Sequence, residues 1–174
     1  MHVLSDWLFA PLRRVVAVLV ANDSNGQIAA GVAIGVVLGL LPKATLLALL
    51  FGVLLAALRV NRAAGLAAAG LTAYVAPSID SFTHALGEKV LTAPSLQPLL
   101  AWCYDAPLGP WIGFHNTIGC GSLLLGMYLT YPAYVTTKAA VIRLRPAAVA
   151  FIQRYRLARV LLGSDLTSRL GALS

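Results

Sequence analysis

The sequence predicts an all-α integral membrane protein with about four short helices, rich in glycine and alanine, that cross or half-cross the membrane, and an amphipathic helix at each end. Of its 174 residues, 59% are hydrophobic and 11% are charged, and the mean hydropathy is +0.82. A soluble globule of this length needs more polar surface. The net charge of +7 comes from short basic clusters beside apolar runs. This pattern is typical of membrane orientation, so no nucleic acid is expected as a partner.

Residues 1–22 predict an interfacial helix on the cytoplasmic leaflet, because their apolar side chains fall at helical spacing and Trp7 suits the headgroup boundary. Arg13 and Arg14 interrupt this segment, and the apolar run that follows is too short for the core of a signal peptide. No cleavage is therefore expected. Residues 22–26, NDSNG, form a turn that caps the next helix.

Residues 26–41, GQIAAGVAIGVVLGLL, predict the helix against which the other segments pack. Gly31, Gly35 and Gly39 recur at every fourth residue and leave one helix face without side chains. In water, each glycine in a helix costs about 1 kcal/mol against alanine. In lipid, helices associate by close packing, so the same groove favours the approach of another helix, whether from this chain or from a partner.

A break is expected at Pro42 and Lys43, since one helix through both neighbouring runs would be about 50 Å long and the proline would remove one of its hydrogen bonds. The helices near residues 27–41 and 43–59 then form a hairpin. Their apolar runs of 14 and 15 residues cover about 21 Å, less than the roughly 30 Å hydrocarbon core. Either the hairpin spans, with Lys43 at the far interface, or it is re-entrant, with Lys43 inside the membrane. We favour spanning, because lysine can snorkel.

A third helix is expected near residues 62–76, with Asn61 as its N-cap. A loop with short helices should follow on the outer leaflet over residues 78–115, because its prolines exclude one spanning helix and its tryptophans suit an interface. A fourth helix near residues 116–137 completes a membrane domain of residues 26–137. The basic clusters then place both termini, including a basic tail of residues 138–174, in the cytoplasm.

Asp80, His84 and Glu88 form the one candidate polar face, since spacing by four puts them on one side of a helix. Such a trio could hold a metal ion or relay a proton, but a solvated helix surface commonly carries the same residues. We favour the solvated reading and predict no metal. The sequence contains no nucleophile motif, phosphate loop, HExxH or paired cysteine motif. No enzymatic activity, catalytic residue or cofactor is expected.

Five stretches carry a family resemblance: GQIAAGVAIGVVLGLLP, LRVN at residues 58–61, SIDSFTHALG at residues 78–87, LQPL at residues 96–99 and NTIGCGSLLLG at residues 116–126. Together they resemble the small prokaryotic membrane proteins of domain-of-unknown-function family 2062 (DUF2062), over roughly residues 25–134. The likeness is closest to a short subgroup whose genes tend to neighbour one for a large, membrane-anchored periplasmic protein. The resemblance implies an inner-membrane protein with such a partner, and it brings no catalytic residues.

Two function classes follow. The first is a non-enzymatic inner-membrane subunit that anchors or feeds a larger periplasmic envelope protein, with lipid transport between membranes as its setting. The second is a small ion or solute channel or transporter, which broken helices also suit. We favour the first, because a conducting path needs several inward polar groups and only Lys43 qualifies. The expected partners are membrane lipids and the periplasmic protein, with a second copy of the chain as an open alternative.

Overall fold

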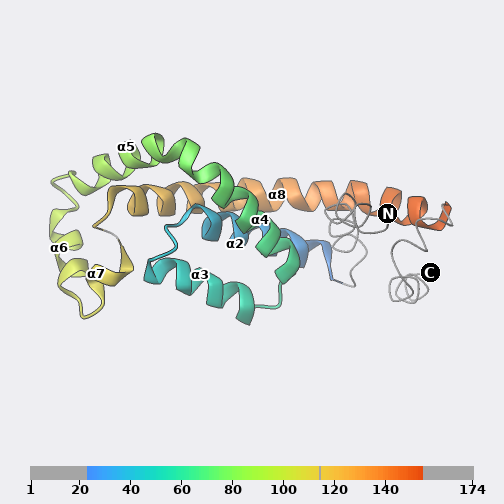
Figure 1. The fold of residues 1–174 in the computed structure, drawn as a ribbon, viewed down its shortest axis with the longest axis horizontal. Coiled ribbons are helices and arrows are strands. Elements are labelled where there is room, and N and C mark those ends of the chain that lie inside the picture. The colour runs from blue at the N-terminus through green and yellow to red at the C-terminus, as the bar shows by residue number, and fades with distance from the viewer. Residues whose placement is uncertain (1–22, 114, 155–174) are drawn as a thin grey trace, which may run out of the picture.

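The fold, shown in Figure 1, is that of a computed structural model that describes residues 23–113 and 115–154. Every regular element in these two ranges is a helix, which confirms the all-α prediction. The interfacial helix predicted for residues 1–22 and the end of the predicted tail, residues 155–174, lie outside the described ranges. The elements follow in the order α2 (Asn25–Leu40), α3 (Leu46–Ala57), α4 (Arg62–Val75), η1 (Ala76–Ile79), α5 (Asp80–Leu91), α6 (Gln97–Asp105), α7 (Gly109–Ile112) and α8 (Thr117–Arg154).

Side-chain caps fix where the first helices begin. The Ser24 hydroxyl accepts a hydrogen bond from the Gln27 N–H at 3.2 Å, and the Gln27 side chain accepts one from the Ser24 N–H at 2.8 Å. This reciprocal pair satisfies two N–H groups that a helix start leaves open. Thr45 caps α3 in the same position, and Asn61 caps α4 through a 2.7 Å bond from the Ala64 N–H. Polar residues between apolar runs therefore set the element boundaries.

The third helix, α4, ends at Val75, within one residue of its predicted end. A short 3₁₀ turn, η1, joins α4 to α5, so that residues 62–91 form one bent helical arm. Pro77 stands at the start of η1, where its missing N–H has no helical partner to lose, and Asp80 lies in the first turn of α5. Three short helices, α5, α6 and α7, occur where a loop with short helices is predicted, and α5 packs along α8.

The last helix is longer than expected. Instead of ending near residue 137, α8 runs for 38 residues to Arg154 and contains Pro132 and Pro146. The predicted end of the fourth helix near residue 137 is therefore wrong. Residues 136–145, TTKAAVIRLR, contain no glycine and several good helix formers, so one lost hydrogen bond at each proline does not end the helix. Thr117–Ala147 is the one stretch, among the described residues, that is long and apolar enough to cross a membrane.

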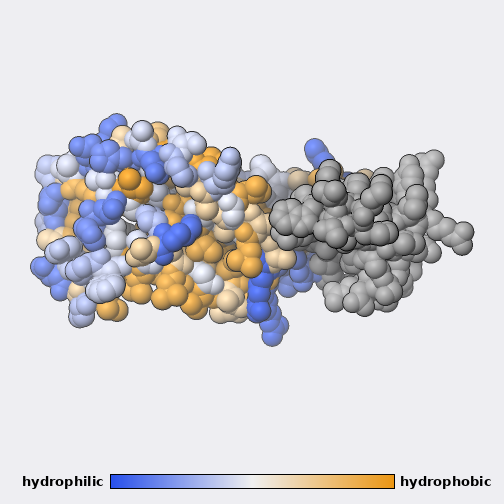
Figure 2. Space-filling model, viewed as in Figure 1, coloured by the Kyte–Doolittle hydropathy of each residue, from blue (hydrophilic) through white to orange (hydrophobic). Residues whose placement is uncertain are grey.

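Packing is organised around α2, which lies between α4 and α8 (Figure 1). Its buried residues are mostly small, and one side of the core joins Ile28 to Ala64 of α4 and Val141 of α8. The other helix of the hairpin, α3, buries only Ala48 and Leu55. Figure 2 shows a largely apolar band over α3 and α4, with polar residues toward both ends of the described part.

Candidate functional site

The glycine groove of α2 is filled by α4. A side-chain carbon added at Gly31 would collide with the carbonyl oxygen of Asn61, and one added at Gly35 would collide with that of Gly65. At Gly39 the obstacle is Thr72, also on α4. The groove therefore holds two backbones of this chain in direct contact, as small residues do between helices in lipid. It leaves no room for a partner's helix.

A second contact between glycines, which the sequence reasoning missed, joins α5 to α8. An added side chain at Gly87 would strike the carbonyl oxygen of Thr117, and one at Gly121 would strike that of Thr83. The contact is reciprocal, and Thr83 is 1% exposed. Its signal in the sequence is a small residue four positions before each glycine, Thr83 before Gly87 and Thr117 before Gly121.

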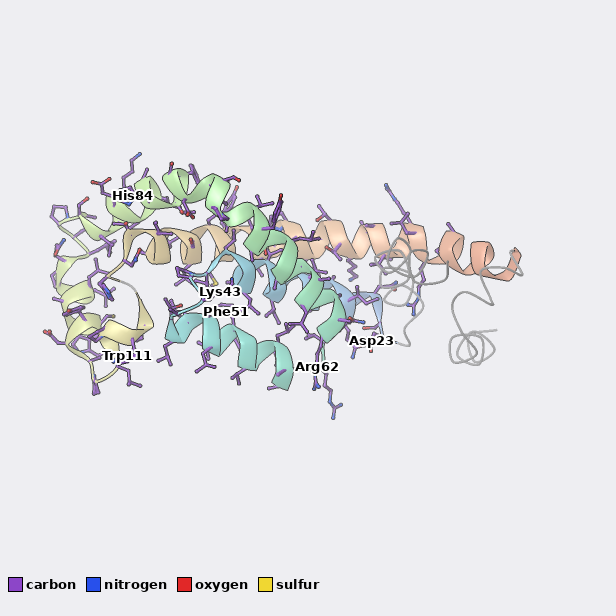
Figure 3. All side chains as sticks on the ribbon, in the orientation of Figure 1. Asp23, Lys43, Phe51, Arg62, His84 and Trp111 are labelled. Carbon is purple, nitrogen blue, oxygen red and sulfur yellow. The ribbon has the colours of Figure 1, made fainter. Side chains whose placement is uncertain are left out.

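The turn between α3 and α4 is tied to the start of α2. Asn61, which is 6% exposed, donates a hydrogen bond from its amide to Asp23 Oδ2 at 2.7 Å. Its backbone N–H donates to the carbonyl oxygen of Gln27 at 3.1 Å. On the same end of the molecule, the Arg145 guanidinium donates to Asn25 Oδ1 at 2.9 Å. Figure 3 shows Asp23 and Arg62 at this end, opposite His84 and Trp111.

Lys43 folds back onto the helix that precedes it. Its Nζ donates hydrogen bonds to the carbonyl oxygens of Leu38 and Gly39, both at 2.8 Å, and to that of Leu41 at 3.0 Å. These acceptors include carbonyls that the end of α2 leaves unsatisfied, and a cation is favoured there by the helix dipole. α2 ends at Leu40 and α3 begins at Leu46, so the break falls where Pro42 and Lys43 stand. If Lys43 lies inside the membrane, the carbonyl oxygens at the end of α2 supply the hydrogen-bond partners that its ammonium group needs.

The polar face of α5 lies beside the start of α8. His84 Nδ1 and Thr117 Oγ1 are 2.6 Å apart, while His84 and Glu88 are exposed and Asp80 is half-buried. Within residues 23–113 and 115–154, no three His, Cys, Asp or Glu side chains gather in a way that could hold a metal ion, and Cys103 and Cys120 are both free thiols. The one specific contact of this face is a hydrogen bond that supports the junction of α5 with α8.

A shallow hollow of about 350 Å³ lies between the hairpin tip and α7, with Thr45 and Trp111 in its wall. His115 also lines it and meets Tyr104 edge to face, with ring centroids 5.9 Å apart. Asn116 caps α8 through bonds from the N–H groups of Ile118 and Gly119 at 2.9 and 3.2 Å. Trp102 and Trp111 are more than 70% exposed, so this end presents aromatic side chains outward.

An apolar surface without a partner among the described residues lies on α3. Leu49, Leu50 and Val53 are 62%, 50% and 53% exposed. α3 contains no polar side chain, and Gly52 on the same helix has open space beside it. Large apolar side chains exposed on a continuous face indicate contact with lipid or with another protein.

The described residues thus define a class: all-helical proteins whose helices touch through small residues and turn large apolar side chains outward. No family model and no solved structure matches the chain. It is 32% identical over 121 residues to an uncharacterized protein of Treponema pallidum (strain Nichols), and the match covers 70% of this chain and 75% of that relative. The chain belongs to the same family as this Treponema pallidum protein.

Proposed function

We propose that this chain is a non-enzymatic integral subunit of the bacterial inner membrane that anchors or feeds a larger periplasmic envelope protein, in a setting of lipid transport between membranes. The observation that carries the proposal is the apolar face of α3, which is exposed along a helix without polar side chains. Burial of small residues with exposure of large apolar ones suits a solvent of lipid. The periplasmic partner is supported by the DUF2062 resemblance.

The proposed topology has both termini in the cytoplasm, and the grouping of the basic residues supports it. Arg59 and Arg62 line one hollow together with Asp23, and Arg145 reaches Asn25 at the start of α2. The end that bears Trp102 and Trp111 would then face the periplasm. On this proposal α7 and the hairpin tip, which line one hollow, lie within the outer leaflet. α8 and the arm from α4 to α5 are the proposed crossings.

The hairpin of α2 and α3 is re-entrant in this proposal, which departs from the spanning arrangement favoured by the sequence. With 16 and 12 residues, the two helices measure about 24 and 18 Å. Both are shorter than the roughly 30 Å hydrocarbon core. Lys43 needs no snorkelling to the far interface, because its three hydrogen bonds are made to the end of α2.

Labelling with a membrane-impermeant thiol reagent on intact cells tests this topology. In a background with Cys103 and Cys120 replaced by alanine, Ser95→Cys should be labelled from outside and Ala44→Cys should not. Labelling of both positions would contradict the re-entrant hairpin and support a hairpin that spans the membrane. Release of the protein from membranes by alkaline carbonate would overturn the membrane proposal itself.

The docking role is tested by photo-crosslinking in native membranes. A photoreactive amino acid at Leu49 or Val53 should give one adduct with a large envelope protein. The matched control is Tyr128 on α8, which is 78% exposed and should not give that adduct. Equal adducts from all three positions would contradict a specific docking face. A solute flux in liposomes that contain this protein alone would instead support a channel or transporter.

A further inference from the structure

A hollow of about 470 Å³ lies where α3 turns into α4 and α2 begins. Arg59, Arg62 and Leu58 line it, together with Asp23 and Asn61. Both arginines are exposed at the rim. The turn beneath them is held in shape by the buried Asn61, whose side chain bonds both Asp23 and the Ala64 N–H at 2.7 Å. The hollow is therefore a fixed feature of the described fold.

The charges around this hollow favour an anion. Neither Arg59 nor Arg62 forms an ion pair within the described part of the chain. The one carboxylate in the lining is Asp23, and its Oδ2 already accepts a hydrogen bond from Asn61. Two arginines and one engaged carboxylate therefore line the hollow. The N–H groups of Arg62 and Ala63, at the start of α4, add two donors on the same side.

We infer that this hollow binds the phosphate of an anionic phospholipid. A guanidinium presents parallel N–H donors that match phosphate oxygens, and two of them can share one diester. The inference rests on the proposed membrane location, which brings phospholipid headgroups to the basic end of the molecule.

The surface next to the hollow points to a lipid rather than to free phosphate. Leu58, in the lining, is 45% exposed, and Leu66, one turn along α4 from Arg62, is 62% exposed. An acyl chain that leaves a phosphate held between the two arginines would lie on these side chains. Inorganic phosphate has no group that could use this apolar surface.

The test is lipid retention by the full chain, purified from membranes in mild detergent and measured by native mass spectrometry. The probes are phosphatidylglycerol, phosphatidylcholine and inorganic phosphate. The wild type should retain phosphatidylglycerol in preference to phosphatidylcholine. The double variant Arg59→Gln/Arg62→Gln should bind phosphatidylglycerol about thirtyfold more weakly, at about 1 kcal/mol for each basic side chain lost. Its binding of phosphatidylcholine should not change.

The matched control is Lys138→Gln/Arg143→Gln, which removes the same charge from α8, outside the hollow. It should keep the preference for phosphatidylglycerol. If both double variants lose the same affinity for phosphatidylglycerol, net charge alone explains the effect and the inference is overturned. So would displacement of the lipid by an equal concentration of inorganic phosphate. A protein that is found in membranes but shows no preference contradicts this site alone, whereas a protein absent from membranes contradicts the proposed function.

Discussion

α2 and α3 are consecutive helices, both almost wholly apolar, yet α2 is enclosed by α4 and α8 while α3 is covered on one side only. The more hydrophobic of the two is the exposed one. In α2 the buried positions include three glycines and two alanines, whereas in α3 leucine and valine point outward. The size of the side chains, and not their hydropathy, separates the two helices.

This difference is the one expected of helices that pack in a membrane, as proposed for this chain. In water, the larger apolar side chain gains more from burial, at roughly 25 cal/mol for each Å². In lipid that gain disappears, because the acyl chains are as apolar as leucine, and close backbone contact becomes the main attraction. A helix with a bare glycine face then packs inside, and a helix with bulky side chains stays outside.

The largest expected effect comes from filling the groove of α2. Gly35→Leu should prevent the folded state from forming, because its side chain would enter the space of the Gly65 carbonyl on α4. Gly52→Leu on α3 is the matched control, since a side-chain carbon there meets nothing within 4 Å. Size-exclusion chromatography and thermal unfolding in detergent measure both variants. Equal behaviour of the two would show that the two helices are not packed differently.

A cavity in the core should have the next largest effect. Ile28 is 2% exposed and packs against Ala64 and Val141. Ile28→Ala should lower the free energy of unfolding by about 3 kcal/mol. Leu50→Ala, on the exposed face of α3, should change it by less than about 0.5 kcal/mol. Thermal melts of the two variants in one detergent give the comparison, and a larger loss for Leu50→Ala would reverse it.

The junction of the two helices should contribute less. Lys43→Met removes three hydrogen bonds from the end of α2 and should cost about 1.5 kcal/mol of stability. Lys43→Arg should recover part of the loss, since a guanidinium can still donate to these carbonyls. Lys89→Met, on the exposed side of α5, is the control for loss of charge. If Lys89→Met costs as much as Lys43→Met, the contacts of Lys43 are not the cause.

The smallest effect is expected at the polar face of α5, which lies outside the contrast between α2 and α3. His84→Ala loses its contact with Thr117 and should cost less than about 1 kcal/mol. Membrane insertion should stay intact, and liposomes with wild type or variant should show no flux. A pH-dependent flux that disappears in His84→Ala would favour the transporter class.

The sequence predicts much of the local structure. The turn before α2, the cap at Asn61 and the interruption near Pro42 are visible because they depend on short-range chemistry, such as a side-chain oxygen near a helix start or a missing N–H. The same rules do not predict that α8 continues past residue 137 and through Pro146. There the chain continues as helix, because the effect of a proline depends on its neighbours and on packing that no short stretch records.

The choice of partners for the small residues could not be predicted. Glycines and other small residues spaced by four occur on α2, α4, α5 and α8, and each pair is compatible with several packings. Gly31 meets Asn61 and Gly87 meets Thr117 because the arm from α4 to α5 crosses from one helix to the other. That crossing is a property of the whole fold. The hydrogen bonds of Lys43 could not be predicted for a different reason. Its acceptors are backbone oxygens, and no sequence motif indicates which backbone oxygens a lysine will reach.

The contacts of Lys43 also bear on the order in which the chain is assembled. Its acceptors lie between two and five residues earlier, so the ammonium group can find them as soon as residue 43 has been synthesised. The glycine groove must wait for residues 61–72, and the long helix that covers its other side comes later still. During synthesis, the one charged side chain of the apolar hairpin can therefore be bound to its own backbone before the rest of the fold is present.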